Sequence, residues 1–381
     1  MAAQVLAERG ISVTIVERMP TLGRKFLLAG RSGLNLTQSE PLDDLVARYV
    51  AESELLPSAL RAFDPAALRT WSAERGEDTY IGSSGRVFPD SWRATSLLRA
   101  WLQYLEHLGV QAQTRTRWVG LDHSISTKTH SSVTLRLENP NGVRTSLTVD
   151  VALLALGGAS WPRTGSDGSW VEILRDAGVV VNELVPSNVG VEVPWVPNFV
   201  ERFEGQPLKN IVVQHGDLRV RGEVVITRRG LEGTPVYSLS SSVRHDLTAT
   251  GRATLLFDLQ PDLSVDSLRR RLATRRPKDS FSNWIRRRVG LSPVATALLR
   301  AGLLNEVGSD ADEPGDIARR IKATPITVTA LAPIERAISS SGGIPFSELD
   351  TSFMLTKLPG MFAAGEMIDW DAPTGGYLLQ G

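Results

Sequence analysis

Two adjacent segments at the start of the chain decide the fold class: Met1-Ala-Ala-Gln-Val-Leu-Ala-Glu-Arg-Gly10, and then Ile11-Ser-Val-Thr-Ile-Val16 with Glu17 behind it. The first segment reads as a helix that ends at a glycine, the residue favoured just past helix C-termini. The second is a β-branched run, which predicts a strand. A helix, a glycine, a strand and an acidic residue form the second half of a βαβ dinucleotide-binding unit. From this segment alone, a helix–strand pair of another α/β fold remains an alternative.

The first half of such a unit, a strand with a Gly-x-Gly-x-x-Gly turn, is not found in the sequence. The acidic residue normally follows that turn by about 20 residues, so Glu17 stands as though the glycines preceded Met1. The chain also stops after Gln380-Gly381, where a helix is expected to begin. We therefore expect a chain that is truncated at both ends, or one that starts at an internal methionine.

Composition bounds the function. The chain has 381 residues, which suggests two or three domains, and its 42 Lys plus Arg balance 42 Asp plus Glu. This balance argues against a generally basic nucleic-acid binder. The absence of cysteine excludes disulfide scaffolds, thiolate metal sites and Cys nucleophiles. No apolar run is long enough to span a membrane and no signal layout opens the chain, so we expect a cytoplasmic protein without a membrane partner.

Two glycine-rich stretches are candidate ligand-binding segments. Gly23–Thr37 contains three glycines and three cations, a composition suited to pyrophosphate, although a basic surface loop fits its spacing equally well. Val149–Leu156 is a continuous apolar run that predicts a strand buried on both faces, and it leads directly into Gly157-Gly158. Ligands of α/β sheets lie beyond the carboxyl ends of strands. Both stretches are therefore predicted to approach a dinucleotide.

The rest of the chain is read more coarsely. We expect mainly helices over 41–110, a three-stranded meander over 110–150, short strands over 186–260 and basic helices over 261–325. Near the end, Glu366, Asp369 and Asp371 have no histidine close in sequence, so no metal site is expected. The five histidines are scattered, and no catalytic residue is assigned.

Five motifs, taken in order, resemble one family. They are Gly23-Arg24-Lys25 through Asn35-Leu36-Thr37, Gly85-Arg-Val-Phe-Pro89, Leu156-Gly157-Gly158 with Thr164-Gly-Ser-Asp-Gly168, Ala364-Gly365-Glu366 with Asp369, and Thr374-Gly-Gly-Tyr377. Together they resemble the aminoacetone oxidase-like, BaiN-type NAD(P)/FAD-dependent oxidoreductases, which are related in fold to glutathione-reductase-type FAD proteins.

The resemblance implies an α/β protein with a discontinuous, Rossmann-like FAD-binding domain over 1–185 and 326–381. An inserted domain, β-rich over 186–260 and helical over 261–325, would separate the two parts. Glu17 would accept hydrogen bonds from the adenosine ribose, Trp118 would meet the adenine, and Tyr377 would lie near the pyrimidine end of the flavin. The other implied FAD-binding residues are Arg24, Lys25, Gly30, Asn35, Thr37, Gly157, Gly158, Gly365, Glu366, Gly375 and Gly376.

The resemblance also implies an oxidoreductase that acts on a small organic substrate, with NAD(P)H as donor or O2 as acceptor. No separate NAD(P) domain is visible, so a nicotinamide donor would dock transiently, and Arg228 and Arg229 are candidates for its phosphate or for an anionic substrate. Two departures leave the substrate unassigned. Leu34 stands where many members have Cys, and Thr227–Pro235 differs from the usual insert motif.

A basic cluster leaves a second hypothesis open, that of a non-catalytic flavin-fold remnant or an RNA-associated protein. Its members are Arg269, Arg270, Arg271, Arg275, Arg276, Lys278, Arg286, Arg287 and Arg288. In an Arg-rich chain of zero net charge, we favour a solvated helical face over a nucleic-acid partner.

Overall fold

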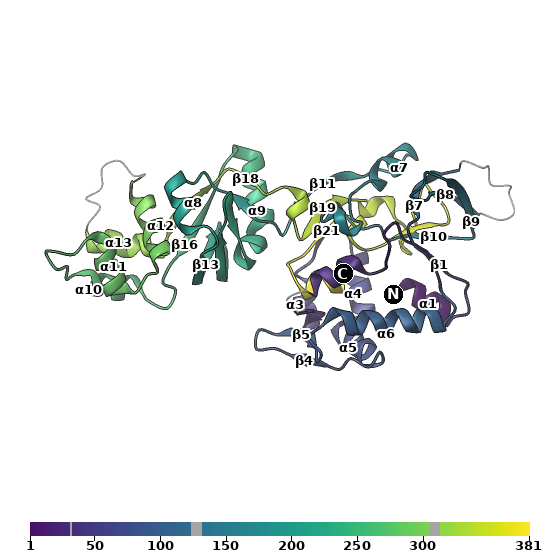
Figure 1. Ribbon diagram of the computed structural model, residues 1–381, viewed down its shortest axis with the longest axis horizontal. Helices are drawn as coiled ribbons and strands as arrows, with labels where there is room; N and C mark the ends of the chain where they lie inside the picture. The colour runs from purple at the N-terminus through teal and green to yellow at the C-terminus, as the bar shows by residue number, and fades with distance from the viewer. Residues whose placement is uncertain (31–32, 123–131, 305–312) are drawn as a thin grey trace. The chain divides into compact units, whose positions relative to one another are not determined.

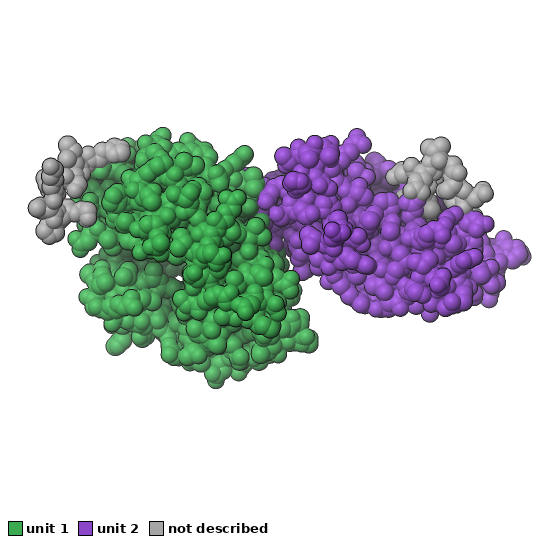
Figure 2. All heavy atoms as spheres, turned by 180° about the vertical axis from the view of Figure 1, so that it is seen from behind, with its two compact units in different colours: residues 1–185, 339–381 green, residues 186–338 purple. Residues whose placement is uncertain are grey.

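The chain forms two compact units in the computed structural model, which describes residues 1–30, 33–122, 132–304 and 313–381 (Figure 1). Unit 1 comprises residues 1–185 and 339–381, and unit 2 comprises residues 186–338 (Figure 2). Unit 1 is therefore built from both ends of the chain.

The start of unit 1 contains the predicted helix, glycine and strand. Helix α1 spans Ala2–Glu8 and strand β1 spans Thr14–Val16. Strand β1 pairs in parallel with β6 (Gln111–Gln113), which follows helix α6 (Ala94–His107). The apolar stripe of α6 is buried at Leu97, Leu98 and Leu105, because its 3.6-residue period keeps these side chains on one face.

A second parallel pair joins the two ends of the chain. Strand β10 (Ala152–Leu154) pairs with β20 (Met361–Ala363), so that residues about 200 positions apart lie side by side. The prediction of a strand buried on both faces is wrong. Leu153 is 41% exposed, because β20 is the one described neighbour of β10 and the described chain leaves one face of this pair uncovered.

Smaller sheets complete unit 1. The predicted meander is present as β7 (Arg117–Leu121), β8 (Val133–Glu138) and β9 (Arg144–Val149), and the Asn139 side chain accepts hydrogen bonds from Asn141 N and Val143 N in its turn. The other strands are β2 (Thr37–Gln38), β3 (Val50–Ala51), β4 (Thr79–Ile81), β5 (Arg86–Pro89), β11 (Asn182–Ser187), β19 (Ser339–Gly343) and β21 (Trp370–Asp371). The other helices are α2 (Arg24–Ala29), α3 (Leu42–Val46), α4 (Leu55–Ala62), α5 (Pro65–Ala73), α7 (Trp170–Asp176) and α14 (Gly376–Gln380).

Unit 2 is built around one antiparallel sheet with the order β17-β16-β13-β14-β15-β12-β18 among its described strands. These strands are β12 (Val191–Glu192), β13 (Pro207–His215), β14 (Leu218–Ile226), β15 (Gly230–Glu232), β16 (Ala253–Asp258), β17 (Thr324–Val328) and β18 (Ala330–Leu331). Its helices are α8 (Pro197–Phe203), α9 (Thr234–Thr250), α10 (Val265–Leu272), α11 (Phe281–Val289), α12 (Pro293–Leu304) and α13 (Pro314–Lys322).

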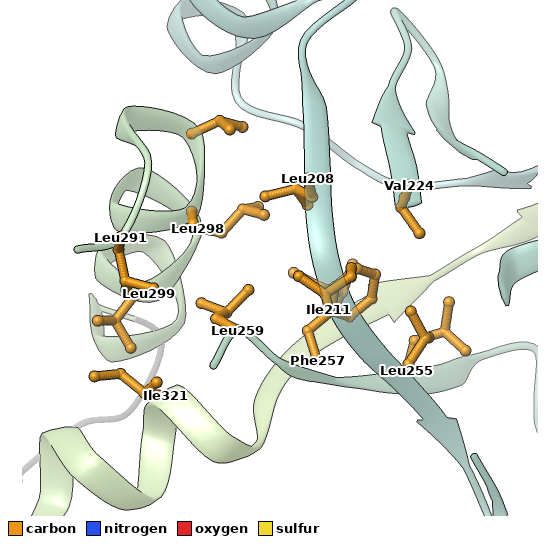
Figure 3. Packing of buried hydrophobic residues seen from close by; sticks show 14 of the residues in the cluster. Leu208, Ile211, Val224, Leu255, Phe257, Leu259, Leu291, Leu298, Leu299 and Ile321 are labelled. Carbon is orange, nitrogen blue, oxygen red and sulfur yellow. The ribbon is translucent and has the colours of Figure 1, made fainter. Parts of the chain in front are cut away.

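One hydrophobic core joins the strands and helices of unit 2. Leu208, Ile211 and Phe257 from the sheet pack with Leu298 and Ile321 from the helices (Figure 3). The β-rich and helical regions, which were predicted as two parts of one inserted domain, share this core. The predicted end at 325 also differs from the compact unit, which extends to residue 338 because β17 and β18 pair within its sheet.

Helix α1 is anchored in unit 1 by one amide. The Gln4 carbonyl oxygen accepts from Trp71 Nε1 at 3.0 Å and from Trp101 Nε1 at 3.1 Å, while its Nε2 donates to Glu8 at 2.9 Å. Gln4→Leu is expected to lower the free energy of unfolding of unit 1 by about 2 kcal/mol, because two indole N–H groups lose their acceptor. Urea unfolding followed by near-UV circular dichroism would measure this loss. Gln103→Leu, at an exposed position of α6, is the control, and an equal effect of both changes would contradict the prediction.

Candidate functional site

The carboxyl ends of β10 and β20 meet in unit 1. Gly157-Gly158 follows β10 and Gly365-Glu366 follows β20, and the parallel pairing places both turns at the same edge. A Cβ atom at Gly158 would lie 3.2 Å from the carboxyl carbon of Glu366 and would overlap the Ser340 hydroxyl. Gly157 and Gly365 have φ values of +72° and +69°, a backbone region that glycine adopts without steric cost. The missing side chain at Gly158 therefore lets the turn after β10 pack closely against Ser340 and Glu366.

Glu366 is the centre of a polar cluster at this edge. Its carboxylate forms an ion pair with Lys25 and accepts from Ser340 N at 2.8 Å. Lys25 Nζ also donates to Ser160 Oγ at 3.0 Å. Residues from three other segments thus meet at one carboxylate. Lys25 was predicted to face pyrophosphate, whereas the structure engages its ammonium with Glu366.

Glu17 lies at the carboxyl end of β1, beside the loop that follows Gly157-Gly158. Its Oε1 accepts from Met19 N at 2.8 Å, and a Cβ atom at Gly165 would lie 3.7 Å from the same oxygen. Arg18, the next residue along the chain, forms an ion pair with Asp167 in this loop. The acidic residue after the first strand and the glycine loop after β10 are therefore neighbours.

The predicted loop ending at Thr37 and the turn near the C-terminal end of the chain are in direct contact. In the orientation that satisfies both partners, the Asn35 amide donates to Thr37 O and accepts from Gly376 N, each at 2.9 Å. A Cβ atom at Gly375 would lie 2.6 Å from the end of the Asn35 side-chain amide, and one at Gly376 would lie 2.6 Å from the carbonyl carbon of Thr37. Only glycines permit this approach.

Tyr377 connects the same turn to the residues after Thr37. Its hydroxyl donates to Glu40, and Tyr49 donates its own hydroxyl to the carbonyl oxygen of Tyr377 at 2.6 Å. Burial, together with the hydrogen bond to Glu40, raises the pKa of Tyr377 to about 12. Burial also raises the pKa of Tyr49. The hydroxyl of Tyr377 is thus hydrogen-bonded within the protein.

This cluster predicts alkaline instability of unit 1. The folded state favours the neutral Tyr377, so its contribution is complete below the ordinary tyrosine pKa of about 10 and is lost as pH rises toward about 12. Tyr377→Phe should make the urea midpoint fall less steeply between these pH values, although Tyr49 leaves part of the slope. Parallel midpoint curves for the two proteins would contradict this expectation.

Three predicted FAD-binding residues lie apart from the clusters described above. Arg24 is exposed at the start of α2. Gly30 allows α2 to pack on α6, since its Cβ would lie 3.3 Å from the backbone nitrogen of Ala94. Trp118 is buried in the core of unit 1, and its Nε1 has no hydrogen-bond partner among the described residues. Their predicted contacts with FAD remain predictions.

The basic residues singled out in unit 2 show two arrangements. Arg229 forms an ion pair with Glu192 at 3.2 Å, whereas Arg228 is exposed. The cluster of nine cations lies on α10, α11 and the segment between them, mostly exposed, while Leu272 and Trp284 on the opposite faces are buried. This arrangement is an amphipathic helical surface, and its interaction with RNA remains an untested alternative.

The described chain offers no metal site and no membrane span. Asp369 accepts from Asn182 Nδ2 at 2.7 Å and from Gly342 N at 3.0 Å. Within residues 1–30, 33–122, 132–304 and 313–381, no group of three His, Cys, Asp or Glu side chains is placed to hold a metal ion. In the same ranges no helix is both long and apolar enough to cross a membrane.

Parallel strand ends, glycine turns and an acidic residue after the first strand define unit 1 as a Rossmann-type dinucleotide-binding fold. The chain belongs to the HI0933-like family, whose Rossmann-domain model matches residues 1–381. The predicted family is thereby confirmed, together with its class, the FAD-dependent oxidoreductases.

Individual proteins resemble the chain over nearly its whole length. A 3-dehydro-bile acid delta(4,6)-reductase from Clostridium scindens is 23% identical over 378 residues, which cover 97% of this chain and 89% of the relative. A 3-ketosteroid delta1-dehydrogenase structure from Sterolibacterium denitrificans covers 100% of this chain and 92% of its own, with 13% identity and a TM-score of 0.49. A 3-ketosteroid-delta4-(5alpha)-dehydrogenase structure from Rhodococcus jostii RHA1 covers 100% of this chain and 93% of its own, with 15% identity and a TM-score of 0.47.

Sequence reasoning missed several residues of this edge. Ser160 and Ser340 both contact the Lys25–Glu366 pair, and Glu40 accepts from Tyr377. Ser160 could have been noticed, because it lies two residues after the Gly157-Gly158 turn. Ser340 and Glu40 carry no comparable local signal.

Proposed function

We propose that this oxidoreductase holds FAD along the edge of unit 1 formed by Glu17, Gly157-Gly158 and Gly365-Glu366, and that it acts on a small organic substrate. The observation that carries the proposal is the convergence of these three strand ends, which are where α/β sheets bind dinucleotides. NAD(P)H is the candidate donor and O2 the candidate acceptor. When bound, the isoalloxazine supplies the hydride or electron transfer.

The residues present fit such a cofactor. A Cβ atom at Gly365 would meet nothing within 4 Å, so the backbone faces open space there. The hydroxyl of Thr37 is buried without a hydrogen-bond partner among the described residues. Glu17 takes a backbone hydrogen bond on one carboxylate oxygen, which leaves acceptor capacity for ribose hydroxyls. We assign Glu17 to the adenosine ribose, and Asn35, Thr37, Gly375 and Gly376 to the flavin end.

The first substrate class to test is an unsaturated ketone. The Clostridium scindens relative is named as a reductase of a 3-dehydro bile acid, and its alignment covers 97% of this chain. An unsaturated ketone accepts a hydride on carbon and a proton elsewhere, which matches the transfer that a reduced flavin supplies. The described residues leave the proton donor unassigned.

The visible absorption spectrum of the purified protein, before and after addition of FAD, tests the proposal. We expect flavin bands that stay with the protein through gel filtration and bleach when NADH or NADPH is added without oxygen. Retained flavin that neither nucleotide bleaches would contradict the proposed donor. Failure to retain any FAD would contradict the proposed site.

A further inference from the structure

Trp161 combines two unusual features. Its backbone lies in the left-handed region, with φ 58° and ψ 60°, and its side chain is 37% exposed. A bulky L-residue adopts this region at a cost in free energy, and such strain is concentrated at functional sites. More than a third of the side chain also stays open to solvent. Folding alone therefore gives no evident reason for this residue in this conformation.

The surrounding loop holds Trp161 in place. The carbonyl oxygen of Trp161 accepts from Thr164 N at 2.9 Å and from Thr164 Oγ1 at 2.8 Å. Arg18 donates to Pro162 O at 3.5 Å and pairs with Asp167 farther along the loop. These contacts within the protein hold the strained backbone at Trp161 in place.

Trp161 and Trp92, two exposed tryptophans of unit 1, differ in the ring contacts that they make among the described residues. None of the described side chains stacks on this indole. Trp92 is a suitable comparison, because it too is exposed and has a positive φ of 62°. Its ring, however, stacks on Phe88 with centroids 4.5 Å apart and covers Gly33. The position of Trp92 is explained by its own contacts, and that of Trp161 is not.

The loop places Trp161 beside the candidate ribose site. The preceding residue, Ser160, contacts Lys25, and Gly165 borders the Glu17 carboxylate, which we assign to the adenosine ribose. A planar base attached to that ribose comes within reach of the loop. Trp118, the residue predicted for this role, is buried in the core and offers no open ring face. We therefore propose that the adenine ring of the dinucleotide stacks on Trp161.

This inference rests on the proposed FAD site and is tested by separating its adenine half from its flavin half. Trp161→Gly should weaken the binding of FAD and of ADP by a similar factor, about tenfold or more, as expected for a lost base–aromatic stack. Binding of FMN, which lacks adenine, should be unchanged. Trp161→Phe should retain most of the affinity. Isothermal titration calorimetry of the flavin-free proteins measures the affinities of Trp161→Gly for FAD, ADP and FMN, and the affinity of Trp161→Phe for FAD.

Stability measurements distinguish stacking from a structural role. Glycine tolerates the left-handed backbone, so the flavin-free Trp161→Gly protein should melt no lower than the wild type. Trp161→Asn, which also tolerates this region, is the second variant. Unchanged FAD and ADP affinities in both variants would overturn the inference and leave the proposed function standing. A wild type that binds no FAD would overturn both.

Discussion

A Gly376→Ala protein is expected to lose its bound FAD and to unfold at a markedly lower urea concentration than the wild type. The added Cβ would lie 2.5 Å from Thr37 Cα, 2.6 Å from its carbonyl carbon and 2.7 Å from its oxygen. These are backbone atoms of β2, which cannot rotate away as a side chain could. We expect a loss of about 3 kcal/mol in the free energy of unfolding of unit 1, at the upper end of the range for overpacking.

The same change should separate the loop that contains Asn35 from the turn that contains Gly376, which together form the proposed flavin end. Asn35 now accepts from Gly376 N, and a displaced turn would break this link between the first loop and the last helix. Gly82→Ala is the matched control in unit 1, because its nearest neighbours would lie at 3.5 Å or beyond. Near-UV circular dichroism in urea and the retained flavin spectrum measure the two effects. Equal midpoints for both variants would contradict the expected clash.

Local signals explain what the sequence predicted well. The Ala2–Glu8 helix and the Thr14–Val16 strand follow from a helical segment, a glycine and a β-branched run. The meander followed from alternating residues and the turn at Asn139, whose side chain caps its own loop. Each of these features depends on residues within a few positions of one another.

Features that depend on distant residues were predicted less well. Helix α9 occupies Thr234–Thr250, inside a region expected to contain short strands, because its Val236, Leu239 and Val243 pack against the sheet of unit 2. Tertiary burial of that kind overrides weak local preference. Leu153 was expected to be buried, yet its exposure depends on how many strands flank β10.

The candidate site shows the same division. Motif order singled out Gly158, Glu366 and Gly376, since glycine turns and a carboxylate at strand ends are local features, and their contacts with FAD stay predictions. The pairing of Lys25 with Glu366, 341 positions apart, had no local signal. The cations of the first loop were therefore expected to face pyrophosphate, and the folded chain pairs one of them, Lys25, with a carboxylate.

A double-mutant cycle on Lys25 and Glu366 is expected to show strong coupling. Glu366 is 18% exposed and Lys25 34% exposed, so breaking the pair should cost less than for a fully buried one. We expect Lys25→Met and Glu366→Gln each to lower the free energy of unfolding of unit 1 by about 2 kcal/mol. The double variant should lose less than the sum, with a coupling energy of about 1–2 kcal/mol.

An exposed pair in the same unit provides the comparison for this cycle. On the β8–β9 hairpin, Arg144 Nε lies 2.9 Å from Glu138 Oε2, and the Arg144 side chain is 75% exposed. Their coupling should not exceed about 0.5 kcal/mol, since solvent screens the attraction. FAD titration of the same variants adds the functional test. Both single changes should weaken FAD binding, because Lys25→Met removes the cation that holds the carboxylate and Glu366→Gln removes the carboxylate itself. If the two cycles gave equal coupling and FAD affinity did not change, the pair would be an ordinary surface salt bridge, and Glu366 would have no part in holding the cofactor.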